Sequence, residues 1–266
     1  MWTDARQATA WAFFWLLLVT AGFVLLRRPG AGGRRWPGWP LILLVAALVR
    51  LLPALWLPVG AGFDIDSYHL VTDALLSGQE VYSAVAGRHP YLPFQMYVMG
   101  AMARLAAATD LPYVVAMKLP SILADAALTG LIYRTVADRH RSDGRGREWA
   151  AYLALLYALN PVSLLVSSYH GQFEAVTLLL LAVGWWLWER RRVTTSAVAV
   201  GLAILNKTWP VLFLPVVLLR LGSWRARLGY TALALGIPAL AVVAYLLAYD
   251  ADPAPMLGRA LTHRGN

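Results

Sequence analysis

The sequence predicts an all-α protein that crosses a membrane several times, and three observations support this prediction. Hydrophobic residues make up 59% of the 266 residues, charged residues make up only 14%, and the mean hydropathy is +0.57. A soluble domain of this length would carry more charge. The apolar residues form long runs, and arginines gather in short loops beside them, as the positive-inside rule predicts. The net charge of +9 therefore follows from membrane topology, and we expect no nucleic-acid partner.

A single transmembrane domain is expected over residues 1–266, with residues 1–40 forming an additional N-terminal helix and loop. Residues 11–26 are apolar and are followed by two arginines. They have neither the basic start nor the small-residue cleavage site of a secretory signal, so we expect them to stay as a membrane helix. Residues 27–40 are rich in Gly and Pro and carry further arginines, which indicates a cytoplasmic loop and an outer N-terminus.

The next predicted crossing, residues 41–61, runs outward and is interrupted only by Arg50. Arg50 is either a functional cation or one whose side chain snorkels to the membrane surface. This crossing delivers residues 62–108 to the extracytoplasmic side as the first loop on that face. The next cytoplasmic marker along the chain is the arginine-rich segment 134–148. Of the two apolar segments before it, only residues 111–136 are long enough to cross without strain, so we expect residues 92–108 to lie in the outer interface. The alternative is that both segments cross, which would place the five arginines of segment 134–148 outside.

The remaining crossings follow from the same criteria. Residues 149–166 run outward and residues 173–188 run inward, so the SSYHGQ segment between them is an extracytoplasmic hinge. The apolar interval that follows begins and ends at cytoplasmic arginines and is best explained by two short helices, with Lys207 at their outer turn or in a cavity. Residues 230–249 cross outward once more. The count is about seven to eight membrane helices, the two short ones included.

Residues 62–93 are the longest polar interval that contains acids and few bases. A short amphipathic helix is expected from Asp64 onward, with a polar stripe of Asp66, His69, Asp73, Ser77 and Glu80. For any one of these acids, a solvated face with Asp64 as the helix N-cap is the simpler interpretation. The functional interpretation is that a carboxylate near lipid acts as a general base toward a hydroxyl group, and that a pair of carboxylates orients that group or holds a divalent cation.

Two further polar interruptions are predicted at the same membrane face. Asn160 and Pro161 break an apolar helix shortly before Tyr169, His170, Gln172 and Glu174. Glu174 is either a functional carboxylate or a helix cap.

The basic residues near these interruptions are candidate phosphate ligands. Lys207 is one of two lysines in the chain and lies inside an apolar run, where it suits a phosphate or an ion pair with Asp125 or Glu174. Arg88 and His89 are candidate phosphate ligands in a loop, with an ordinary exposed loop as the alternative. The chain has no cysteine, which excludes thiolate chemistry.

The ordered set of these motifs resembles the GT-C glycosyltransferases that use polyprenyl-phosphate sugars, especially bacterial relatives of the GPI mannosyltransferases and the glycosyltransferase 87 group. The resemblance extends over about residues 41–209 of this chain. The pieces that carry it are Asp64-Ile-Asp66, Thr72-Asp73-Ala74 with Gly78 and Tyr82, RHPYLP from Arg88, Asn160-Pro161 with YHGQFE from Tyr169, and LNKTWP from Leu205.

The resemblance implies an inverting enzyme of the plasma membrane with an extracytoplasmic active site. It would transfer a monosaccharide, most simply a mannose-like hexose, from a polyprenyl-phosphate donor to a lipid or glycan acceptor. Asp64 corresponds to the catalytic base and Asp66 completes an acid pair, with Mg²⁺ or Mn²⁺ at these two residues left open. The substrate-binding residues implied are Asp73, Arg88, His89, Tyr169, His170, Gln172, Glu174 and Lys207.

Two other classes of function remain open from the sequence. A transporter or lipid flippase would place broken helices and Lys207 around a site near the midplane, and it predicts pseudo-symmetric halves that the sequence does not display. A non-catalytic partner subunit is the second alternative. Members of the resembling family are commonly longer, so both a fragment and a reduced member of the family are consistent with this length.

Overall fold

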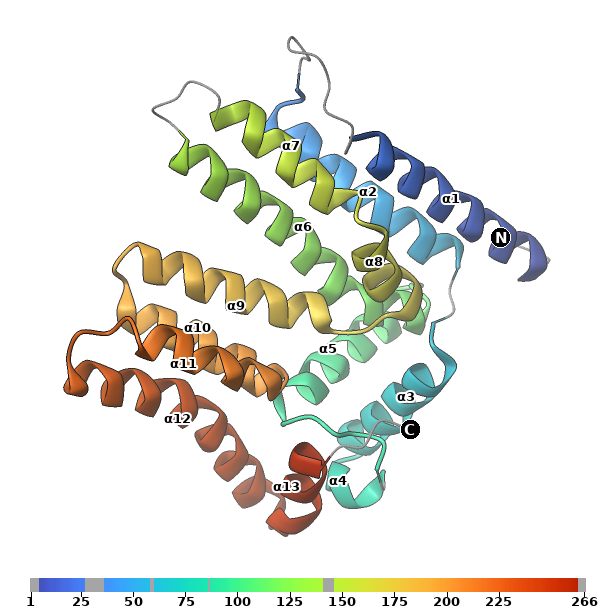
Figure 1. The fold of residues 1–266 in the computed structure, drawn as a ribbon. Coiled ribbons are helices and arrows are strands. Elements are labelled where there is room, and N and C mark those ends of the chain that lie inside the picture. Colours follow the sequence, from blue (N-terminus) through green and yellow to red (C-terminus); the bar gives the residue numbers. More distant parts are fainter. Residues whose placement is uncertain (1–4, 27–35, 58–59, 86, 141–145, 263–266) are drawn as a thin grey trace. The chain divides into compact units, whose positions relative to one another are not determined.

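The computed structural model describes residues 5–26, 36–57, 60–85, 87–140 and 146–262 (Figure 1). Every regular element in these ranges is a helix, which confirms the predicted all-α class. Residues 27–35 of the predicted loop 27–40, residues 141–145 of the arginine-rich segment 134–148, and the last residues of the tail, 263–266, lie outside the described ranges. The chain divides into two compact units, Met1–Gly62 with Leu111–Ala175, and Phe63–Asp110 with Val176–Asn266. We call these unit 1 and unit 2.

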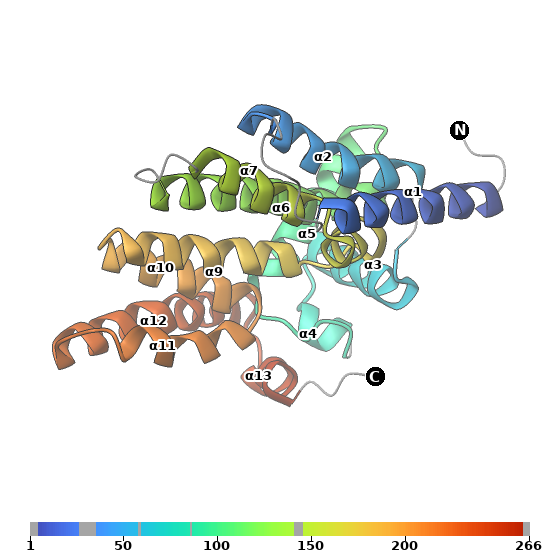
Figure 2. The same ribbon diagram turned by 45° about the horizontal axis from the view of Figure 1, so that its top comes forward.

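Unit 1 is a bundle of long helices. Its helices are α1 (Ala5–Leu26), α2 (Trp39–Trp56), α6 (Tyr113–Arg139) and α7 (Gly146–Ala158), and α2, α6 and α7 run side by side (Figures 1 and 2). Ile42 of α2 packs against Ala151 and Leu155 of α7 in its apolar core. Small residues at such positions let helices approach closely, which is the usual way in which membrane helices pack.

The predicted break at Asn160 and Pro161 is confirmed. After α7, the chain turns by 43° into α8 (Pro161–Leu164), which continues as a π-helical turn, η1 (Leu165–His170). The Asn160 side chain accepts the backbone N–H groups of Val162 and Ser163, so it is the N-cap of α8. Because the helix extends to His170, the hinge predicted over 167–172 is shorter than expected and begins at Gly171, whose φ of 79° suits glycine.

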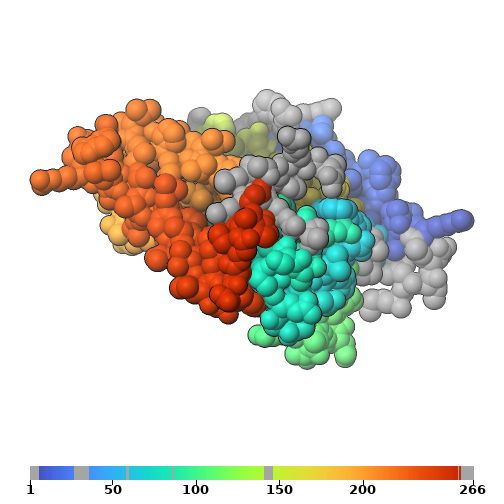
Figure 3. All heavy atoms as spheres, turned by 90° about the horizontal axis from the view of Figure 1, so that it is seen from below, coloured from blue at the N-terminus to red at the C-terminus, as the bar shows by residue number. Residues whose placement is uncertain are grey.

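Unit 2 holds the loop helices and the C-terminal helices. These are α3 (Gly62–Leu76), α4 (Val81–Ala84), α5 (Phe94–Ala108), most of α9 (Glu174–Glu189), α10 (Val193–Asn206), η2 (Trp209–Phe213), α11 (Leu214–Leu218), α12 (Trp224–Tyr249) and α13 (Pro253–Thr262). Helices α10 and α12 pack tightly, and a Cβ at Gly201 would lie 2.8 Å from the carbonyl oxygen of Ala234. Helix α13 lies against α4 (Figure 3).

Four of the described helices, α1, α2, α6 and α12, are long and apolar enough to cross a membrane. The bent pair of α7 with α8 and η1 makes a fifth if it is one span. The expected seven to eight included α9, α10 and α11, which have 16, 14 and 5 residues and are shorter than the hydrocarbon thickness requires. The two short helices expected around Lys207 are present as Val193–Asn206 and Trp209–Leu218, and the described residues form a multi-pass helical membrane protein, as predicted.

Candidate functional site

Helix α3 carries the acidic residues of the first loop. It begins at Gly62, so Asp64 lies within its first turn and is not its N-cap as the simpler interpretation required. Asp66, His69 and Asp73 are exposed, as the polar stripe predicted. The helix ends at Leu76, and Gly78 follows with a φ of 74°. The N–H of Ser77 still donates to the carbonyl of Asp73 at 3.0 Å, so the stripe reaches Ser77 and stops before Glu80, and only the extension to Glu80 was wrong.

Glu80 is instead a structural residue of α4. Its carboxylate accepts the backbone N–H groups of Tyr82 and Ser83, and it accepts a hydrogen bond of 2.6 Å from the hydroxyl group of Tyr245 on α12. That same hydroxyl accepts the N–H of Val81 at 2.9 Å. Burial raises the pKa of Glu80, but these hydrogen bonds outweigh it, so the pKa lies below its usual value. Tyr245 thus ties the loop that follows α3 to helix α12.

Arg88 lies over the first turn of α3. Its guanidinium carbon is 4.3 Å from the centroid of the Phe63 ring, and its Nη1 donates a hydrogen bond of 3.4 Å to Ser67. Successive residues of a helix are rotated by about 100°, so the face shared by Phe63 and Ser67 lies between the directions of Asp64 and Asp66. Arg88 therefore packs on the face of α3 that is flanked by the positions of Asp64 and Asp66.

The two acids do not converge on one point. Asp64 and Asp66 are two residues apart on a helix, and side chains at this spacing do not face each other. Asp64 is half-buried, whereas Asp66 is exposed. Across the described part of the chain, no group of three or more His, Asp or Glu side chains is placed to hold a metal ion. A Mg²⁺ or Mn²⁺ ion at Asp64 and Asp66 therefore stays a prediction.

His89 is buried between two tyrosines. The centroid of its ring lies 5.4 Å from that of Tyr82 and 5.9 Å from that of Tyr91, and its side chain is 1% exposed. Burial lowers the pKa of His89 to about 4, although a hydrogen bond with the backbone of Leu92 acts in the opposite direction. At neutral pH the imidazole is uncharged, so it contributes no positive charge to a phosphate site.

Lys207 follows α10 at the turn between the two short helices, as predicted. Its Nζ lies 4.7 Å from the centroid of the Tyr91 ring and 3.5 Å from the Tyr91 hydroxyl group, and the residue is 8% exposed. Tyr91 is three residues after Arg88, and a segment of that length spans at most about 10 Å. One short loop thus connects the acid-bearing helix α3 with Lys207 inside unit 2.

The other predicted site residues belong to unit 1. The Tyr169 hydroxyl group donates a hydrogen bond to the carbonyl of Ala12, so this side chain is directed to α1. The His170 side chain is exposed, and its backbone carbonyl accepts the N–H of Ala61 at 3.3 Å. The backbone carbonyl of Gln172 accepts a hydrogen bond of 2.5 Å from Ser121. Glu174 is the first residue of α9, where a carboxylate also suits the helix dipole.

Unit 1 contains buried charges that the sequence interpretation did not connect. Lys118 is fully buried, and its Nζ donates a hydrogen bond of 3.0 Å to the carbonyl of Leu57 at the end of α2. Asp125 lies two helical turns further along α6 and forms a 2.9 Å ion pair with Arg50. The expected alternative partner of Lys207, Asp125, is therefore engaged by Arg50, which does not snorkel. The sequence held a signal for these residues, because Lys118 and Asp125 both lie in the predicted crossing 111–136 and ionisable residues are rare within membrane helices.

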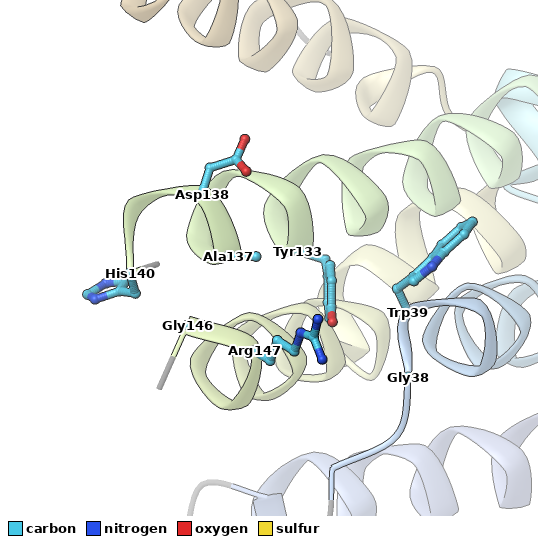
Figure 4. A pocket seen from close by; sticks show the side chains of 8 residues that line it. All are labelled: Gly38, Trp39, Tyr133, Ala137, Asp138, His140, Gly146 and Arg147. Carbon is cyan, nitrogen blue, oxygen red and sulfur yellow. The ribbon is translucent and has the colours of Figure 1, made fainter. Parts of the chain in front are cut away.

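A hollow of about 830 Å³ lies in unit 1 beside the start of α2, at the opposite end of this helix from Leu57 (Figure 4). It is lined by the start of α2, the end of α6 and the start of α7, and Trp39, Tyr133 and Arg147 project around it. Helix α2 has 18 residues, which corresponds to about 27 Å between its two ends. None of the predicted site residues lines this hollow.

The fold and the spans define a multi-pass helical membrane protein, and a comparison with family models adds its enzymatic class. The model of glycosyltransferase family 87 matches residues 91–252, which is more than half of the chain. The chain belongs to glycosyltransferase family 87. Searches among curated proteins and among solved structures gave no match. The family predicted from the motifs is confirmed, and it supports glycosyltransferase activity. The matched range includes Tyr91, the segment 169–174 and Lys207, and it begins after α3.

Proposed function

We propose that the protein transfers a monosaccharide, most simply a mannose-like hexose, from a polyprenyl-phosphate donor to a hydroxyl group of a lipid or glycan. The reaction takes place at the extracytoplasmic face of the plasma membrane. The family supplies the reaction class. The observation that carries the finer proposal is the loop of unit 2, in which Arg88 lies against the first turn of α3 and Tyr91 contacts Lys207. Through this loop, Arg88 lies against the acid-bearing helix α3, and Tyr91 lies against Lys207.

Asp64 is assigned the role of general base. Its carboxylate takes the proton of the acceptor hydroxyl group, and the oxygen attacks the anomeric carbon of the donor sugar. The bond between that carbon and the phosphate oxygen breaks, and its electron pair leaves with the lipid phosphate. Attack from the side opposite the leaving group inverts the anomeric configuration. Asp64 is chosen over Asp66 because the family resemblance matches it to the catalytic base, and because its side chain is half-buried whereas that of Asp66 is exposed.

Arg88 and Lys207 are assigned to the phosphate of the donor. Negative charge develops on that phosphate as the sugar leaves, and positioned cations stabilise it in the transition state. His89 is neutral and buried, so its role is to support the loop between the two cations. Asp66 and Asp73, which are exposed on α3, are assigned to hydroxyl groups of the substrates.

The segment at the end of η1 is assigned to the sugar or the acceptor. His170 is exposed, and the backbone around it is fixed by hydrogen bonds with Ala61 and Ser121. Gln172 and Glu174 follow directly in the chain. Tyr169 binds the backbone of α1, so it holds this segment in place.

The test is to incubate the purified protein in lipid nanodiscs with tritiated polyprenyl-phosphate mannose and a membrane lipid extract as acceptor. The proposal predicts a radiolabelled product with mannose covalently attached to a new lipid or glycan. The Arg88→Gln and Lys207→Gln variants should lower its formation, whereas Arg220→Gln, at the end of α11, should not. In proteoliposomes, movement of the label across the bilayer without covalent transfer would support the transporter class instead.

A further inference from the structure

Arg50 occupies a fully buried position in the middle of unit 1. It lies on α2, is 0% exposed, and forms its 2.9 Å ion pair with Asp125 of α6, which is 1% exposed. A buried ion pair alone is weak evidence for stability, because removing two charges from water costs about as much as their attraction returns. The remaining contacts of the guanidinium therefore decide what this arginine does.

All five donor positions of the guanidinium are matched by acceptors. Nε binds Asp125, Nη1 binds the carbonyl oxygens of Ala46 at 3.1 Å and Ala158 at 2.8 Å, and Nη2 binds the carbonyl of Tyr157 at 3.3 Å and the hydroxyl group of Ser163 at 2.9 Å. Three of these five acceptors lie on the two sides of the bend between α7 and α8. The arginine of α2 thus joins both arms of the broken helix.

The two carbonyl groups at the end of α7 are those that the break releases. Pro161 has no N–H group to donate to the carbonyl of Tyr157 four residues before it, so that carbonyl keeps only the N–H of Asn160, at 3.0 Å, as a backbone partner. The N–H of Val162, which would reach the carbonyl of Ala158, binds the side chain of Asn160 instead. Within a membrane helix the carbonyl of Ala158 needs another partner, because no water is present to hydrate it. Arg50 donates to both, and its positive charge also suits a helix C-terminus.

Asp125 fixes the same joint from α6. Its Oδ2 accepts the hydroxyl group of Ser163 at 2.8 Å, and its Oδ1 accepts that of Tyr157 at 2.5 Å. Ser163 is on α8, and Tyr157 is on α7. The carboxylate and the guanidinium therefore hold both arms of the bend against α2 and α6.

We propose that Arg50 is a positioning residue of the transferase: with Asp125 it fixes the bend between α7 and α8 and thereby holds residues 169–172 in place. Helix α8 and η1 run without interruption from Pro161 to His170, so a change in the bend moves His170. The function of that segment rests on the proposed function, but the placement itself does not.

The placement can be measured with spin labels, because the chain contains no cysteine and introduced cysteines are unique. Glu148→Cys on α7 and His170→Cys at the end of η1 are both at exposed positions on opposite sides of the bend. Glu148→Cys with Leu123→Cys, which is exposed on α6, is the matched pair that does not cross the bend. Pulsed electron–electron double resonance on the full-length protein in nanodiscs gives the distance distribution of each spin-label pair.

The decisive variant is Arg50→Lys. A lysine keeps the charge beside Asp125 but has no planar fork to bridge Ser163 and the carbonyls of α7. We expect the distance across the bend to broaden and shift, while the reference pair stays unchanged. The control Thr129→Val removes a buried hydroxyl group that binds the backbone carbonyl of Asp125 within α6 and does not reach the bend, so it should retain the narrow distribution. An unchanged distance across the bend in Arg50→Lys overturns the proposal.

Two additional results keep the test decisive. If the distance of the reference pair also changes in Arg50→Lys, the test uses Ser163→Ala instead. This variant removes the hydroxyl group that binds both Arg50 and Asp125. A wild-type distance across the bend in Ser163→Ala overturns the proposal. In the Arg50→Lys variant, kcat for transfer from tritiated polyprenyl-phosphate mannose should be at least about tenfold lower than in the wild type, since a displacement far from the reacting atoms can cost that much in rate. The spin-label result needs no transfer activity, so failure of this inference is distinguishable from failure of the proposed function.

Discussion

The burial of His89 predicts a specific loss of stability at mildly acidic pH. Its pKa is lowered from 6.5 to about 4 in the folded protein. The unfolded chain therefore binds a proton first as the pH falls, and stability decreases between pH 6.5 and pH 4. With these two values, the linkage relation gives a loss of about 2 kcal/mol between pH 7.5 and pH 5. The residue is almost fully buried, so little solvent screening reduces this effect.

The comparison that isolates this effect is between the wild type and His89→Asn. Asparagine cannot be protonated, and its amide can still donate a hydrogen bond to the backbone of Leu92. Thermal unfolding in detergent should show a larger fall in the midpoint from pH 7.5 to pH 5 for the wild type, by roughly 4–8 °C. Other titrating groups lower the midpoint equally in both proteins, and the loss of packing in His89→Asn lowers its midpoint equally at both pH values. Both effects therefore cancel when the falls in midpoint of the two proteins are compared. Equal pH dependence in the two proteins would refute the buried, neutral imidazole.

Two further predictions concern the attachment of α4 to α12. Tyr245→Phe leaves the fully buried N–H of Val81 without its acceptor, which costs about 1–3 kcal/mol. Amide exchange of residues 81–85 should therefore accelerate, and it should not in the control Tyr249→Phe. Glu80 has a lowered pKa, so its contribution to stability is present above about pH 4.5 and is lost as the pH falls through the lower folded value. The unfolding midpoint of Glu80→Gln should therefore fall less than that of the wild type between pH 5.5 and pH 3.5, and an identical fall would contradict the role of Glu80 as a cap.

The breaks in the helices were predictable because each has a local cause. Pro161 lacks an N–H group, and Asn160 before it is a favourable N-cap, so the end of α7 is encoded in two adjacent residues. Lys207 is costly inside an apolar helix, which placed it correctly at a turn between short helices. Local rules of this kind predicted the all-α class and most of the helix positions.

The parts that failed depend on contacts distant in the sequence or on backbone conformation. Arg50 and Asp125 are 75 residues apart, and nothing in either segment indicates that one binds the other. The polar stripe was extended to Glu80 by helical periodicity, but Gly78 adopts a positive φ and ends that regularity. The partner of Glu80 is Tyr245, which lies 165 residues away. Periodicity therefore identified the polar residues of this loop, whereas tertiary contacts determine which of them are structural.

The proposed function assigns Asp64 as the general base of the sugar transfer. The most direct test compares the rate of mannose transfer from tritiated polyprenyl-phosphate mannose by the wild type, Asp64→Asn and Asp73→Asn. Both changes are isosteric and both lie on α3, so they share any effect on that helix. The proposal predicts that Asp64→Asn lowers kcat by at least about 10²-fold, as removal of a general base does, and that Asp73→Asn mainly raises KM. A folded Asp64→Asn variant with the wild-type kcat would contradict the claim.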